Sequence, residues 1–305
     1  MAFPRLRLPG VSWKHPLVDL AAHALDPVDS LVRTVRGARH LPRYSVRIRS
    51  NGLRRQFGGG RFLREGRTIR DLLIELAGLT PASDVLEIGC GCGRTAHALA
   101  GWLEPGRYTG VDVERVALAA CQRSSELGAR GFRFAHMDVA NREYNPGGQT
   151  PAARYCFPYP AASFEVVFLI SVFTHMLAED VTRYVEEICR LLRPGGRCLL
   201  STFLLDHGRA GKTLSFPHPL GPARLERADL PEIAVAYPGA FFADAFRRHG
   251  AEPRGAPRIG QWRAGPPAPD IAFGQDVLVF ERWSATLQRG PGTAGLQPGS
   301  RSDLD

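Results

Sequence analysis

From residue 84 onward, the chain alternates short apolar runs with segments whose apolar residues recur at helical spacing. The apolar runs fall at 84–88, 108–111, 132–135, 164–170, 197–203 and 276–280. The helical patterns lie at 94–103, 114–127, 178–192 and 240–249. Because consecutive parallel strands need a crossover, this alternation predicts βαβ units and a doubly wound, mainly parallel α/β sheet.

We expect this domain to cover residues 61–283, after a basic, partly helical extension at 1–60 and before a disordered tail at 284–305 that is rich in Gly, Pro and Ser. Apolar residues between Leu17 and Val35 recur at helical spacing, and Asp26 followed by Pro27 is typical of a helix start. The extension is therefore predicted to hold two short amphipathic helices whose apolar stripe packs on a partner surface. Two connections, 136–163 and 204–239, are long enough to be substrate loops.

The net charge of +9 arises in the first 70 residues, which hold 15 Arg and Lys against 4 Asp and Glu. No aromatic residues alternate with these arginines as in a base-stacking surface, so the charge does not favour a nucleic-acid partner. The absence of an 18-residue apolar run and of a signal-peptide pattern predicts a cytoplasmic protein without membrane contact. The six cysteines have no zinc-ligand spacing, so no metal is expected.

The first strand, 84–88, runs into a glycine-rich turn with the spacing G-x-G-x-G, formed by Gly89, Gly91 and Gly93. Glycines let the backbone approach a ligand closely, and the following helix start offers N–H groups. Arg94 stands where a dinucleotide-binding turn needs its third glycine. Glu87, two positions before the turn, suits a cationic group better than phosphates.

Acidic and polar residues also follow the next strands. Asp112 ends the second strand, where a carboxylate can accept hydrogen bonds from both hydroxyls of a ribose. Asp138 and the Val139 N–H follow the third strand and are placed to bind an adenine edge, although Asp138 is also a candidate helix N-cap. The fourth strand delivers Ser171 and His175 to the same crevice.

With these motifs the chain resembles the class I S-adenosylmethionine-dependent methyltransferases over residues 61–281. It is most similar to a bacterial subgroup whose motifs here are 57–60 (FGGG), 144–146 (YNP), 171–175 (SVFTH), 192–197 (LRPGGR) and 275–276 (QD). The resemblance implies a seven-stranded sheet in which the last strand runs antiparallel beside the fifth. It implies contacts with S-adenosyl-L-methionine at Glu87, Gly89, Gly91, Gly93, Asp112 and Asp138. We expect Val113, Val139 and Ser171, at the same strand ends, to complete this set.

The resemblance does not identify an acceptor, because this fold serves many substrates. Our main hypothesis is O- or N-methylation of a small molecule, with Tyr144, Tyr159, Trp262 and Arg263 near the acceptor. His175 is the candidate general base; its alternative role is to cap the strand end. Three other functions stay open: an RNA or protein methyltransferase that uses the Arg-rich region, a nicotinamide-dependent oxidoreductase, and a non-catalytic cofactor binder.

Overall fold

The computed structural model describes residues 16–52, 56–142, 144–206, 214–262 and 274–284. A central sheet of seven strands has the order β3-β2-β1-β4-β5-β10-β9. Its strands are β1 (Asp84–Ile88), β2 (Arg107–Asp112), β3 (Arg133–His136), β4 (Phe164–Leu169), β5 (Leu192–Thr202), β9 (Ala251–Pro253) and β10 (Asp276–Arg282). Strands β1 to β5 pair in parallel, and β10 runs antiparallel to both β5 and β9. The expected α/β fold class and the antiparallel last strand are confirmed.

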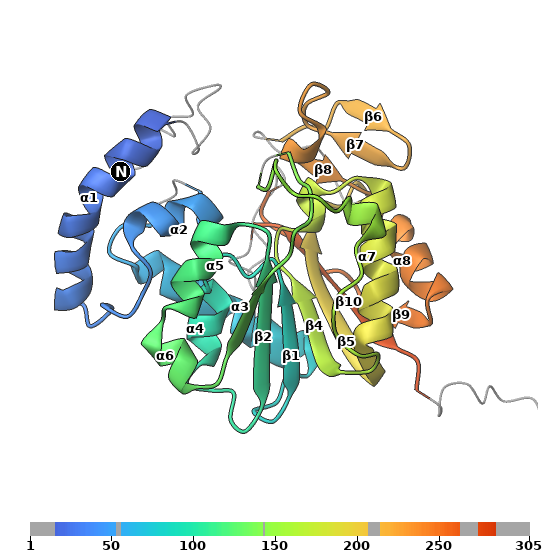
Figure 1. Ribbon diagram of the computed structural model, residues 1–305. Helices are drawn as coiled ribbons and strands as arrows, with labels where there is room; N and C mark the ends of the chain where they lie inside the picture. The colour runs from blue at the N-terminus through green and yellow to red at the C-terminus, as the bar shows by residue number, and fades with distance from the viewer. Residues whose placement is uncertain (1–15, 53–55, 143, 207–213, 263–273, 285–305) are drawn as a thin grey trace, which may run out of the picture.

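Helices cover both faces of this sheet (Figure 1). One face packs in an apolar cluster with α7 (Ala178–Leu191) and α8 (Gly239–Arg248). The other face packs with α3 (Gly60–Ala77), α4 (Arg94–Leu99), α5 (Arg115–Gln122) and α6 (Ser125–Ala129). The sheet is thus the middle of three layers. Among the described residues, no helix combines the length and the apolar composition that a bilayer span requires.

The six strands predicted from the sequence are present, and β9 is an additional strand. The segments between the strands differ from the prediction in several places. The 114–127 helix is divided into α5 and α6, because the Ser124 side chain accepts a hydrogen bond from the Leu127 N–H and starts a new helix. The Pro-Gly-Gly segment of the 192–197 motif lies within β5, where the register with β4 shifts. The 204–239 connection contains a second sheet of β6 (His218–Leu220), β7 (Ala223–Leu225) and β8 (Val235–Ala236), followed by α8.

The N-terminal extension departs most from expectation. Instead of two short helices, it forms one 20-residue helix, α1 (Pro16–Val35), with Pro27 inside it, followed by α2 (Tyr44–Asn51). Among the described residues, the apolar stripe does not pack on another part of the chain. The stripe faces solvent, and its most exposed members are Leu17 (69%), Leu20 (68%), Leu31 (66%) and Val35 (81%).

The polar side of α1 is the side that packs. The Asp29 carboxylate accepts hydrogen bonds from Arg33 Nε at 2.8 Å, Arg47 Nη2 at 2.6 Å and the Gly58 N–H at 2.7 Å. Asp29 and Arg47 are fully buried. Buried charges need such partners, so this polar network determines which side of α1 faces the protein.

Candidate functional site

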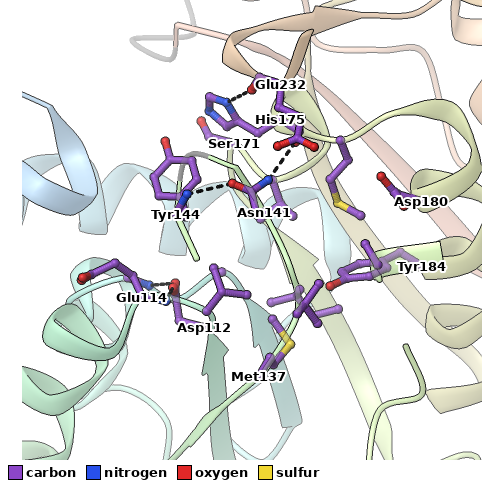
Figure 2. A pocket seen from close by; sticks show the side chains of 18 of the residues that line it. Asp112, Glu114, Met137, Asn141, Tyr144, Ser171, His175, Asp180, Tyr184 and Glu232 are labelled. Carbon is purple, nitrogen blue, oxygen red and sulfur yellow. Dashed lines mark hydrogen bonds between the residues drawn. The ribbon is translucent and has the colours of Figure 1, made fainter. Parts of the chain in front are cut away.

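A cavity opens at the carboxyl ends of β1, β2 and β4 (Figure 2). The strand order places β4 on one side of β1 and β2 on the other, so the chain direction through the sheet reverses here. Ligands of doubly wound folds bind at such a switch point. The empty space between its walls, counted to the open mouth and including open solvent, is about 940 Å³. A second cavity adjoins it and shares Gly89, Gly91 and Ser171 with it.

The glycine-rich turn lines one wall of both cavities. Gly89 has φ +79° and Gly91 has φ +53°, which L-residues rarely adopt. A Cβ atom on Gly89 would lie 2.5 Å from Val172 Cγ2, so the space itself requires glycine. Gly93 (φ +83°) is the N-cap residue of α4 and lies outside the lining of both cavities.

Asp112 stands at the end of β2 with its carboxylate facing the cavity. Its Oδ2 accepts the Gly91 N–H at 2.6 Å, and its Oδ1 accepts the Glu114 N–H at 2.7 Å. These bonds fix the carboxylate but use only part of its capacity of about four acceptor positions. Burial raises the pKa of Asp112 to about 6. Val113 lies next to it on the cavity wall.

Glu87 lines the second cavity and is 3% exposed. The Tyr108 hydroxyl donates a hydrogen bond to its Oε2. Burial raises the pKa of Glu87 to about 8, which the Tyr108 hydrogen bond and the Arg94 charge only partly oppose. A cation bound beside Glu87 would favour its ionised form.

Apolar residues follow β3. Met137 and Val139 line the same cavity as Asp112. Asp138, between them, does not contribute to the lining of this cavity, and its backbone carbonyl accepts the Thr150 N–H at 3.0 Å.

The other end of the cavity is polar. His175 lies in a short 3-10 helix after β4, and Glu232 lies in another between β7 and β8. His175 Nδ1 is 2.9 Å from the Glu232 carbonyl oxygen. Because a carbonyl only accepts, Nδ1 carries the proton and Nε2 is the basic nitrogen of the neutral ring. The Asn141 amide donates to the His175 carbonyl at 3.4 Å, and the Tyr144 ring contacts the His175 ring edge-to-face at 5.3 Å.

Ser171 is held in a strained conformation beside these residues. Its φ is +61°, in a region uncommon for a residue with a side chain. Its hydroxyl donates to Gln275 Oε1 at 2.8 Å, and its N–H donates to Ser201 Oγ at 2.9 Å. The hydrogen bond to Gln275 joins the 171–175 and 275–276 motifs across 104 residues of sequence.

Two residues that we expected near the acceptor lie elsewhere. The Tyr159 ring packs edge-to-face on Phe164, away from the residues that line the cavity. Trp262 belongs to a separate aromatic cluster, where its Nε1 donates to the Asp276 carboxylate at 2.8 Å. Arg263 lies outside the described residues.

Other residues line the cavity that the sequence did not single out. Arg49 and Ser50, at the end of α2, form part of its wall. Arg49 is held there by ion pairs of 3.2 Å to Asp19 and to Glu114. The sequence offers no local signal that distinguishes Arg49 from its neighbouring arginines. Asn141 follows β3 closely enough that the strand-end argument would have found it.

Residues 86–198 match the protein family described as a methyltransferase domain. The matched segment contains β1 to β4 and the start of β5. A solved structure, the PH0226 protein of Pyrococcus horikoshii, shares the fold with a TM-score of 0.50 at 12% identity, over 73% of this chain and 92% of its own.

Three curated relatives are methyltransferases. A phthiotriol/phenolphthiotriol dimycocerosates methyltransferase of Mycobacterium ulcerans is 32% identical over 41% of this chain and 38% of its own length. A tRNA N(3)-cytidine methyltransferase of Homo sapiens is 28% identical over 44% and 32%. The 27-O-demethylrifamycin SV methyltransferase of Amycolatopsis mediterranei is 30% identical over 61% of each. The chain thus spans less than two thirds of the length of each relative.

Proposed function

We propose that this protein is an S-adenosylmethionine-dependent methyltransferase that methylates an oxygen or nitrogen atom of a small-molecule acceptor. The observation that carries the proposal is a single cavity with Asp112 and the glycine-rich turn at one end and His175 at the other. The methyltransferase family match and the relative named for rifamycin methylation support this function.

The residues fit the cofactor in three places. The fixed Asp112 carboxylate retains acceptor positions for two ribose hydroxyls. Val113, Met137 and Val139 offer an apolar slot for the adenine ring. Glu87, buried beside the turn, receives the positive ammonium group of the methionine part.

We assign the finer contacts from the same geometry. The Asp138–Val139 segment lies beside the adenine position, and Ser171 and the turn glycines lie along the methionine part. Gly93 supports the cofactor site indirectly, because it ends the glycine-rich turn as the N-cap residue of α4. Tyr144, on the polar side of the cavity, is the remaining candidate contact for the acceptor.

When bound, the cofactor supplies an electrophilic methyl carbon on its sulfonium. The cavity residues align the acceptor oxygen or nitrogen behind that carbon, and alignment alone can supply up to roughly 7 to 11 kcal/mol. For a hydroxyl acceptor, His175 Nε2 would accept the proton that leaves the acceptor oxygen when that oxygen receives the methyl group. The Glu232 carbonyl holds the ring in the required tautomer.

Calorimetric titration tests the cofactor assignment. S-adenosylmethionine and S-adenosylhomocysteine should each bind with one site per chain, and NAD should not bind. Binding of NAD alone would instead support an oxidoreductase. Binding of S-adenosylmethionine without any methyl transfer to fractions of a metabolite extract would support a non-catalytic binder.

Methylation of tRNA is the second candidate function. It is favoured by the relative named for tRNA methylation and by the basic extension. Arg33, Arg47 and Arg49 are engaged in ion pairs within the protein, which reduces the charge available to RNA. Transfer of labelled methyl groups to tRNA that falls steeply with salt would identify this function, because phosphate contacts release counterions.

A further inference from the structure

Three potential metal ligands from separate segments meet on the side of the molecule that carries the N-terminal extension. His40 lies between α1 and α2, His97 lies in α4, and Glu126 lies in α6. One ligand atom from each lies within 4.8 Å of the other two. His97 Nδ1 is 2.8 Å from Glu126 Oε2, and His40 Nε2 is 3.9 Å from the same oxygen. The three ligand atoms are therefore close enough together to contact a single metal ion.

The spacing fits a zinc ion. Zinc binds imidazole nitrogen and carboxylate oxygen at about 2.0 to 2.2 Å in tetrahedral geometry, which separates neighbouring ligand atoms by about 3.4 Å. The two distances to Glu126 lie on either side of that value. Side-chain shifts of about 0.5 to 0.6 Å would bring both of these distances to that value.

Burial differs among the three ligands in a way that suits such a site. The His97 side chain is 1% exposed and packs beside Phe62, whereas His40 and Glu126 are 36% and 38% exposed. The ion would be coordinated by the buried His97 on one side and would be open to solvent on the other side. Water can fill a fourth position there.

The local charges permit a cation. Arg33 and Arg130 are the basic side chains that act on His40 and Glu126. Arg33 is paired with Asp29, and Arg130 is paired with Glu104.

We propose that His40, His97 and Glu126 bind a Zn²⁺ ion that fastens the N-terminal extension to the methyltransferase domain. The segment that carries His40 leads directly into α2, whose last residues, Arg49 and Ser50, line the cavity. A metal bond at His40 would therefore hold α2 over the cavity. The site does not depend on the identity of the methyl acceptor.

Titration of the full chain, free of any histidine tag, with ZnCl₂ tests this site. We expect one equivalent to bind and His40→Ala to weaken binding at least tenfold. His23→Ala removes an exposed histidine of α1 that pairs with Asp19 and is the matched control. Cys156→Ser removes an exposed thiol that could bind zinc by itself. Both controls should bind zinc as the unchanged protein does.

Two further measurements separate a structural ion from surface binding. Zinc should raise the melting temperature of the unchanged protein and of His23→Ala but not that of His40→Ala, because binding to the native state stabilises it. Zinc should also slow amide hydrogen exchange at residues 37–43. Equal zinc affinity in His40→Ala and in the unchanged protein, or no saturable binding at all, would overturn the proposal.

Discussion

The raised pKa of Glu87 makes a quantitative prediction about Glu87→Gln. The pKa of this carboxyl rises from 4.5 to about 8 because the folded protein buries it. The folded state therefore binds the proton more tightly than the unfolded state, and the free energy of unfolding falls as pH rises from about 4.5 to about 8. Each pH unit in that interval is worth about 1.4 kcal/mol, so the whole interval amounts to roughly 5 kcal/mol.

Glutamine keeps the shape of Glu87 and cannot ionise. In the absence of cofactor, Glu87→Gln should match the unchanged protein in stability near pH 4.5 and exceed it by several kcal/mol at pH 8.5. Urea denaturation of both proteins at several pH values measures this difference. Glu104→Gln, at a side chain that is 78% exposed, is the control and should show little pH-dependent difference. A difference for Glu87→Gln that stays constant with pH would refute the reasoning.

The same variant should bind S-adenosylmethionine at least tenfold more weakly in a calorimetric titration, because it lacks the carboxylate that receives the ammonium group. Asp112→Ala should weaken cofactor binding by about 2 kcal/mol, or about thirtyfold, and unchanged affinity would contradict the ribose assignment. With a hydroxyl acceptor, His175→Gln should lower turnover at least a hundredfold with cofactor affinity intact and remove the activity loss toward about pH 6; a loss below tenfold would return His175 to a structural role. Asp29→Ala should lower the free energy of unfolding, measured by urea denaturation, by about 3 to 5 kcal/mol, because it leaves the buried Arg47 without its ion-pair partner. The control Asp19→Ala should lower the free energy of unfolding by less than about 1 kcal/mol.

The central sheet could be predicted because the signals that define it are local. Six of its seven strands contain a short apolar run, whereas β9 has only three residues and was not predicted. The turn after β1 carries glycines that its backbone requires. The strand ends also placed Asp112 and His175 in one crevice, where the structure has them. Both results depend only on the rule that parallel strands share a carboxyl edge.

The side of α1 that packs could not be predicted in this way. Its apolar spacing indicates an inward-facing stripe, but the interior contact is made by Asp26, Asp29 and Arg33. Their hydrogen-bond partners include Ser45 and Arg47 on α2, up to 19 residues away in the sequence. A periodic sequence pattern does not predict hydrogen bonds between two different helices. The three-stranded insertion was missed for a similar reason, since strands of two or three residues carry almost no pattern.

The cavity is built from the chain in two different ways. Its cofactor end comes from consecutive strand ends, and Asp112 is fixed by backbone N–H groups that any sequence would supply. Its polar end combines Arg49, Asn141, His175 and Glu232, which belong to four separate segments. Two of those segments, α2 and the β6–β8 insertion, lie outside the central sheet. Evolution can therefore exchange one acceptor for another by altering these peripheral segments while the cofactor end is inherited unchanged.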